Sequence, residues 1–140
     1  MRRMEQSELS AQFRELMPFA ELVGLEIYEA TPELVRGRVP WAEERCTTGG
    51  ILHGGLLMAL ADSCGAVCAV LNMPEGANGT ATIESKTNFL RPVRDGAVTA
   101  STRPLHRGRS TIVLETELAR DDGELAAKVT QTQAFHYPRA

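Results

Sequence analysis

The chain has 140 residues, which is enough for one domain with a single hydrophobic core. Its formal net charge at pH 7 is −3, and no basic stripe with interleaved aromatic residues is present, so we expect no nucleic-acid partner. The first residues, MRRMEQSELSAQF, include two arginines but no apolar run behind them, which argues against a secretory signal.

The cysteines and histidines suggest neither disulfides nor a metal centre. The three cysteines are an odd number in no disulfide pattern, which suits a reducing cytoplasm. Cys64 and Cys68 are one helical turn apart, but further ligands are lacking nearby, so we expect them to be small core residues. The three histidines show no metal-ligand spacing, and we expect no metal or redox cofactor.

The first third of the chain predicts a short helix and a hairpin. Residues 7–17 place apolar side chains on one side of an amphipathic helix, with Ser7 as its cap and Pro18 at its end. Residues 24–41 predict a β-hairpin: apolar and polar side chains alternate in two short segments, which a turn at residues 31–33 separates. The following residues, 42–50, form an irregular loop without the glycine pattern of a phosphate-binding loop.

The stretch 47–71 becomes strongly apolar after Gly54-Gly55 and predicts a central helix that starts near residues 53–55 and ends near residues 72–76. The segment GGLLMALADSCGAVCAVL has only two polar side chains, Asp62 and Ser63, and apolar or small residues occupy every face. Such a helix is typical of a domain interior, where it is buried on all sides. A membrane span is the alternative, but it needs about 20 apolar residues, and a carboxylate near its middle is expensive. We therefore expect no membrane partner.

The start of this helix has the chemistry of an oxyanion site. Gly49-Gly50 and Gly54-Gly55 let the backbone turn tightly and approach a ligand closely. Unpaired N–H groups and the positive end of the helix dipole suit an oxyanion or a thioester carbonyl. Asp62 lies about 12 Å further along the helix, at about 1.5 Å per residue, so the two groups can cooperate only if they come from two chains. The alternative role for Asp62 is a structural hydrogen bond to a neighbouring donor.

From Thr80 onward the hydrophobic pattern alternates with a period of two. It predicts four strands, over residues 80–90, 97–106, 109–120 and 125–137, with Pro104 marking an edge or a bulge. The element order indicates an α+β fold in which one curved antiparallel β-sheet wraps around one long central helix. A sheet of this size covers one helix face poorly, so we expect at least a homodimer.

Two segments, TTGGILHGGLLMALAD and TATIESKTNFLRPV, carry a family resemblance. The chain resembles hotdog-fold acyl-CoA thioesterases of the PaaI type, which are related to phenylacetyl-CoA and 4-hydroxybenzoyl-CoA thioesterases. The specific parts are G-x-x-H-G-G, the acid nine residues after that histidine, and the F-L-x-P end of the next strand. The resemblance extends from about residue 19 to 137. It implies one hotdog domain over residues 1–140, with an N-terminal helix over 1–18 and the glycine turn and central helix over 47–72.

The resemblance implies catalytic roles for five residues. Gly54 would polarise the thioester carbonyl with its backbone N–H, and Asp62 of the neighbouring subunit would act as general base on water or as nucleophile. His53 would shape the turn or bind near the thioester, with a purely structural role as the alternative. Thr82 would orient the attacking water, unless it is an ordinary strand threonine. Thr47 stands where relatives often have asparagine, and its shorter side chain lacks the two N–H donors of an amide.

A second set of residues is implied in substrate binding. The turn at residues 106–109 is rich in basic side chains, and in relatives this loop lies near the phosphates of coenzyme A, which guanidinium groups suit. A solvated hairpin tip is the alternative. The expected binding residues are Gly55, Arg107, Gly108, Arg109 and Ser110.

These observations favour a cytoplasmic acyl-CoA thioesterase that assembles as a homodimer at minimum and, by the resemblance, as a homotetramer built from two dimers. Water would add to the thioester and release a carboxylic acid and coenzyme A, which is part of the substrate. Two alternatives remain open: a hotdog acyl-CoA hydratase or dehydratase, and a non-catalytic acyl-CoA-binding module. The acyl group also stays open, because the pocket would be shaped by side chains of two subunits.

Overall fold

Two helices precede the sheet. The computed structural model describes residues 5–140, apart from the side chain of Gln6. Helix α1, Gln6–Leu16, is followed by α2, Pro18–Val23, a second helix beyond the one predicted for this region. Pro18 lies in the first turn of α2, where its missing N–H costs no helical hydrogen bond. Gly24, with φ of 72°, ends α2 in the left-handed conformation that glycine adopts easily.

The predicted N-cap of α1 is wrong. Glu5 is the N-cap instead of Ser7, because the helix begins before Ser7. The backbone N–H of Glu5 donates to the carboxylate of Glu8 at 3.3 Å, and the two glutamates form a capping box. Residues 1–4 of the predicted N-terminal helix segment lie outside the described residues.

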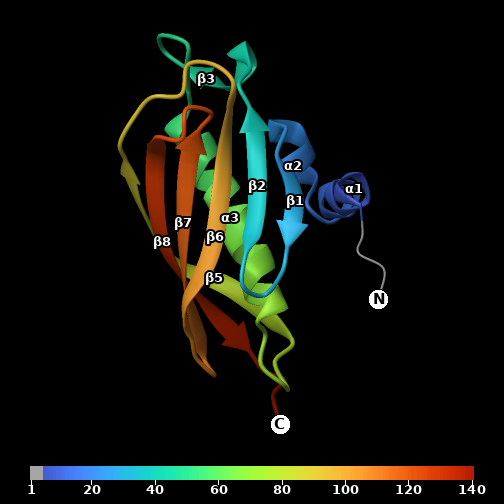
Figure 1. Cartoon of the computed structure of the whole chain (residues 1–140). Coiled ribbons are helices and arrows are strands. Elements are labelled where there is room, and N and C mark those ends of the chain that lie inside the picture. The colour runs from blue at the N-terminus through green and yellow to red at the C-terminus, as the bar shows by residue number, and fades with distance from the viewer. Residues whose placement is uncertain (1–4) are drawn as a thin grey trace.

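Six strands form one antiparallel sheet in the order β1-β2-β6-β7-β8-β5 (Figure 1). These strands confirm the predicted hairpin and the four later strands, with ends that shift by one or two residues. Their bounds are Glu26–Ala30 for β1, Val35–Pro40 for β2, Gly79–Phe89 for β5, Ala97–Arg107 for β6, Thr111–Arg120 for β7 and Leu125–His136 for β8.

Pro104 lies inside the sheet and not on an outer strand. Strand β6 pairs with β2 only as far as Thr102, and a bulge follows between Pro104 and His106 on its β7 side. The proline therefore stands where the ladder toward β2 has already ended, so no hydrogen bond is lost there. Of the two predicted alternatives, the bulge is confirmed.

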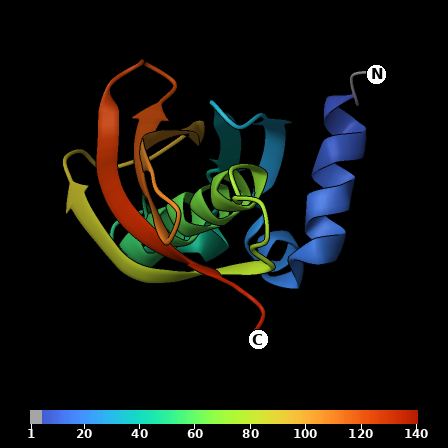
Figure 2. The same ribbon diagram turned by 90° about the horizontal axis from the view of Figure 1, so that it is seen from below.

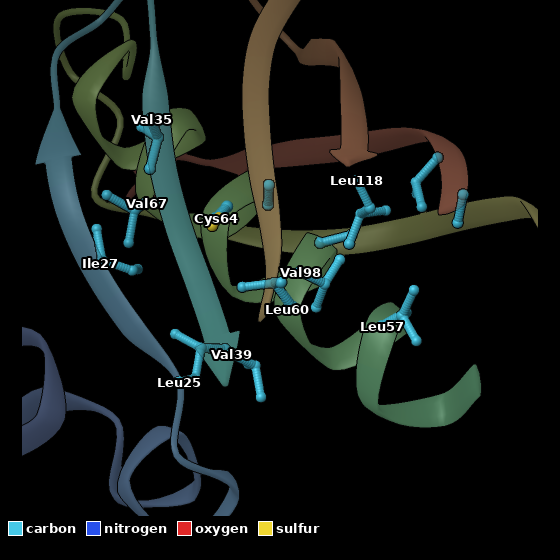
Figure 3. Close-up of a cluster of buried hydrophobic side chains, with 14 of the residues drawn as sticks. Leu25, Ile27, Val35, Val39, Leu57, Leu60, Cys64, Val67, Val98 and Leu118 are labelled. Atoms are coloured by element: carbon cyan, nitrogen blue, oxygen red, sulfur yellow. The ribbon is translucent and has the colours of Figure 1, made fainter. Parts of the chain in front are cut away.

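Helix α3, Gly54–Leu71, lies in the hollow of the curved sheet (Figures 1 and 2). It contacts all six strands, and fully buried residues such as Leu60 and Cys64 face the concave side of the sheet (Figure 3). By length and composition alone α3 could cross a membrane. Its packing against the strands makes it the core helix of this domain.

The prediction that α3 is buried on every side is wrong for the single chain. Met58, Asp62 and Val70 follow one another along one face of the helix, at i, i+4 and i+12, and all three are exposed. The sheet covers the opposite face, so a stripe of the helix stays exposed, interrupted by the half-buried Ala66.

One edge of the sheet is covered by a helix, and the other is exposed. Helix α1 stands beside the β1 edge (Figure 2), and the Ser10 hydroxyl donates to the Ile27 carbonyl at 2.8 Å. In the described chain, β5 pairs only with β8, and most of its residues, including Ile83 and Phe89, are exposed. An open edge of this length is a template for pairing with another strand.

Candidate active site

The loop before α3 is built from a small hairpin. A 3₁₀ turn, Glu43–Arg45, leads into β3, Cys46–Thr47, which pairs with β4, Ile51–Leu52. Gly49 and Gly50 form the turn between them with φ of 81° and 70°, which side chains rarely adopt. The glycines at this turn are therefore required by the backbone conformation.

Two side chains hold this glycine turn in place. The Trp41 indole Nε1 donates to the Gly50 carbonyl at 3.0 Å, and Arg94 Nη1 donates to the Gly49 carbonyl at 3.0 Å. Neither residue was predicted to contribute to the site. Trp41 lies 9 residues from Gly50 and Arg94 lies 45 residues from Gly49, and neither stands in a recognisable motif, so only the tertiary structure reveals their role.

His53 is the N-cap of α3 and decides which amide groups stay free. Its imidazole Nδ1 accepts from the Gly55 N–H at 2.9 Å, and its carbonyl accepts from the Leu56 N–H at 2.9 Å. Gly54 is the first residue of the helix, and no described residue accepts from its N–H. His53 thus caps the helix, and the free amide is that of Gly54.

Gly54 opens into a largely apolar hollow of about 330 Å³. Strand β5 closes one side of it: a Cβ at Gly54 would lie 3.1 Å from the Phe89 ring, so a larger residue has little room there. Thr47 lines the same hollow. The lining is Thr47, Ile51, Leu52, Gly54, Leu57, Phe89, Leu90, Arg91, Pro92 and Val93.

Asp62 lies on the exposed face of α3 and not among apolar side chains. The Thr82 hydroxyl of β5 donates to its Oδ1 at 2.9 Å, which leaves the second carboxylate oxygen available. The Thr82 side chain therefore contacts the candidate carboxylate directly. Asp62 is eight residues after Gly54, so the two groups stay about 12 Å apart along one helix. A single chain does not bring them to one reacting carbon.

The basic loop lies at the other end of α3. Arg107 Nε donates to the Asn72 Oδ1 at 2.7 Å, and its Nη2 donates to the Pro32 carbonyl at 3.2 Å. Asn72 is the C-cap of α3, about 27 Å from Gly54 at about 1.5 Å per residue. Arg107 thus joins the loop to the helix end and to the β1–β2 turn.

The other loop residues are held mainly through their backbones. Gly108 N–H donates to the Thr111 carbonyl at 2.8 Å, and the Ser110 carbonyl accepts from Phe135 N–H at 2.9 Å. The Arg109 carbonyl accepts from the Tyr137 hydroxyl, while its side chain is exposed. Arg109 therefore has the guanidinium group that is free to meet an anion.

The comparisons with known proteins agree on one family. A family model described as the thioesterase superfamily matches residues 49–127. The inferred esterase SSO2140 of Saccharolobus solfataricus is 38% identical over 90 residues, which cover 64% of this chain and 63% of that protein. The inferred esterase PA1618 of Pseudomonas aeruginosa is 31% identical over 114 residues, covering 81% and 79%.

Solved structures agree with the sequence relatives. A mutant form of thioesterase PA1618 has a TM-score of 0.86 and 27% identity, with 98% of this chain and 97% of that chain covered. Thioesterase HI1161 of Haemophilus influenzae has a TM-score of 0.85 and 25% identity, with 97% and 93% covered.

Proposed function

This chain belongs to the thioesterase superfamily and has its hotdog fold, and we propose that it hydrolyses an acyl-CoA thioester to a carboxylic acid and free coenzyme A. Thioester hydrolysis is the chemistry named for its relatives. The observation that carries the proposal is the exposed Asp62 carboxylate, which accepts a hydrogen bond from Thr82 of β5. Asp62 lies on α3, the same helix that has the free Gly54 amide at its start. The motifs quoted above favour the PaaI type within this superfamily.

The chemistry follows from the charge that develops during hydrolysis. When water adds to the thioester carbonyl, its oxygen becomes an oxyanion, and the Gly54 N–H with the helix dipole behind it stabilises that charge. Asp62 takes the proton from the attacking water, or attacks the carbonyl carbon itself. The C–S bond then breaks, and the thiolate of coenzyme A leaves and takes up a proton. No metal or redox cofactor takes part in this scheme.

The site is completed by a second copy of the chain. Because Gly54 and Asp62 are about 12 Å apart on one helix, a carbonyl bound at Gly54 receives the carboxylate of the partner's helix. The open β5 edge and the exposed stripe on α3 lie on this same part of the molecule and suit pairing with an identical chain. The assembly we propose is a homodimer at minimum, and a homotetramer of two such dimers in the cell.

The substrate's two ends have separate binding regions. The apolar hollow beside Gly54, with Thr47 at its wall, receives the atoms next to the thioester carbon. The loop of Arg107, Gly108, Arg109 and Ser110 receives the coenzyme A phosphates. Since this loop lies about 27 Å from Gly54 of its own chain, it serves the site whose Asp62 comes from the same chain. We place the protein in the cytoplasm, because a reducing compartment suits its free cysteines.

Replacement of Asp62 tests the proposal. In a free-thiol release assay over aromatic, medium-chain and hydroxylated acyl-CoAs, we expect Asp62→Asn to lower kcat by about 10²–10⁴-fold, the usual effect of losing an acid–base group. KM should change little, because the Gly54 amide and the basic loop are untouched. Glu117→Gln, an exposed carboxylate on β7, is the matched control and should keep wild-type kcat. Full activity of Asp62→Asn, or no hydrolysis of any acyl-CoA by the wild type, would contradict the proposal.

A further inference from the structure

Strand β8 buries two glutamines against the helix and the neighbouring strand. Gln131 and Gln133 are each 1% exposed, and they share the inward face of β8 two residues apart. Glutamine is mostly an exposed residue, so two of them side by side in a core call for a specific reason. The mechanism described above uses neither of them.

Gln131 binds the helix turn that carries Asp62. Its Nε2 donates to the carbonyl of Ala61, the residue just before Asp62, at 3.1 Å. Gly65 makes this contact possible, because a Cβ at that position would lie only 1.7 Å from Gln131 Nε2. The side chain therefore lies across the turn from Ala61 to Gly65 and ties it to the sheet.

Gln133 binds the strand segment that carries Thr82. Its Oε1 accepts from the Thr80 hydroxyl at 2.7 Å, and Thr82 is its backbone partner in the ladder between β5 and β8. A bulge follows directly, between Thr82 and Glu84. A bulge loosens the local ladder, so the Thr80 contact gives this part of β5 a second attachment.

The hydrogen bonding of the two glutamines is incomplete, which argues against a purely stabilising role. Gln131 Oε1 and Gln133 Nε2 are buried and have no partner among the described residues. Leaving a buried acceptor or donor unpaired costs free energy, and an apolar side chain of similar length would avoid that cost. The glutamines instead hold specific groups in place: Gln131 holds the Ala61 carbonyl, and Gln133 holds the Thr80 hydroxyl.

We propose that Gln131 and Gln133 are positioning residues for Asp62. One fixes the helix turn from which the carboxylate projects, and the other fixes the strand whose Thr82 hydroxyl orients it. This inference rests on the proposed function, in which the Asp62 carboxylate must meet a carbonyl bound to another chain. A displacement of about 1 Å at such a carboxylate lowers the rate by about 10²-fold. The contacts of the two glutamines should therefore affect kcat.

Gln131→Met tests the helix anchor, because methionine has a similar length and no hydrogen-bond donor. We expect kcat to fall by about 10- to 100-fold while KM stays within about threefold. The same substitution in the Asp62→Asn background, measured at high enzyme concentration, should lower the residual rate by less than about twofold, since residues that act as a unit are not additive. Thr80→Val tests the strand anchor separately, at a partly exposed position that tolerates the change.

The matched control is Thr116→Val. It removes a buried hydrogen bond of the same sheet, the 2.7 Å contact with Thr102, and should leave kcat unchanged. The inference is overturned if Gln131→Met and Thr80→Val lower kcat no more than this control, or if they lower it equally with and without Asp62. If Gln131→Met does not fold, Thr80→Val decides between the two outcomes. Failure of the proposed function is recognised separately, since Asp62→Asn alone would then keep full activity.

Discussion

One imidazole ring decides which amide stays free at the start of α3. His53 takes the Gly55 N–H for itself, and the Gly54 N–H stays free beside a hollow that only a residue without a side chain leaves open. Gly55, expected among the substrate-binding residues, thus contributes its N–H to the helix cap. The donor that we propose for the oxyanion is therefore set by the cap geometry and not by the glycine pair as such.

The buried thiol of Cys64 makes folding stability sensitive to alkaline pH. Burial raises the pKa of this thiol from its ordinary 9.0 to about 12, with the neighbouring Cys68 as a smaller cause. The folded chain therefore keeps a proton that the unfolded chain loses above pH 9. The protonated thiol therefore adds to the free energy of unfolding. This stabilisation is fully present below pH 9 and is lost as the pH rises toward 12, at about 1.4 kcal/mol per pH unit.

We therefore expect the free energy of unfolding in urea to decline from pH 9 to pH 10.5, and Cys64→Ala to flatten this decline. Cys64→Ala also leaves a small cavity, so it should be less stable than wild type at pH 7.5. Val67→Ala, a non-ionising truncation in the same helix, separates the two effects. It should lower stability by a similar amount at every pH. An unchanged slope in Cys64→Ala would show that this thiol does not ionise on unfolding.

At the scale of elements, the strongest contrast is between the two outer strands of the sheet. Strand β1 is covered by α1 through the Ser10 hydroxyl, whereas β5 presents an open edge of 11 residues. The apolar side chains that β5 exposes, such as Ile83 at 62%, would be a liability in a lone chain. In the proposed dimer, a partner chain would cover β5.

The basic loop has two arginines with different surroundings. Arg107 supports the end of α3 through Asn72, while the Arg109 side chain is exposed. If the loop binds coenzyme A phosphates, Arg109→Ala should raise KM for acyl-CoA by about 10-fold with little effect on kcat, which matches the loss of one charge-assisted contact. The effect should shrink as ionic strength rises, since salt screens exposed charges.

A truncated substrate provides the control for this loop. An acyl-pantetheine lacks the phosphates at the far end of coenzyme A, so its KM should not respond to Arg109→Ala. Arg107→Ala should raise KM for acyl-CoA and also lower the melting temperature, because it breaks the contacts with Asn72 and Pro32. Equal effects of Arg109→Ala on both substrates would contradict phosphate binding and would indicate that the loop is a solvated hairpin tip.

At the scale of the whole molecule, the proposed site requires two chains, and mixing two inactive variants tests this proposal. Asp62→Asn removes the carboxylate, and Gly54→Leu fills the space below the Phe89 ring. A mixed dimer then contains one site with an intact Gly54 from one chain and an intact Asp62 from the other. After equal mixing and reassembly we expect roughly a quarter of the wild-type activity, since half of the dimers are mixed and each has one working site.

The oligomeric state must be measured on the same samples. Light scattering should give a dimer or larger assembly at micromolar concentration for both variants and the wild type. Confirmed mixed dimers without activity would contradict the shared site. A stable monomer with full activity would contradict the two-chain proposal as a whole.

Local pattern in the sequence was sufficient for most of the elements. The alternation after Thr80 predicts the four later strands, and the apolar run with its glycine start predicts α3. These features repeat every two or every few residues, so they are visible without knowing what packs against them. Helix α2 was missed because its six residues are too few for a periodic signal, and the N-cap of α1 because several residues near its start are able to cap.

The chemistry of the candidate site was predictable only in part. Gly54, His53 and Asp62 stand in one short motif, and the rise of a helix is enough to separate the first and last by about 12 Å. The sequence by itself therefore determined the fold class, and the helical rise led to the proposal of a second chain. The tertiary structure decided that Asp62 is exposed and held by Thr82, that Trp41 and Arg94 hold the glycine turn, and that Gln131 lies under the helix turn of Asp62. These contacts join residues 9 to 70 positions apart, and hydrogen bonds between distant segments depend on strand register and helix placement, which no local pattern encodes.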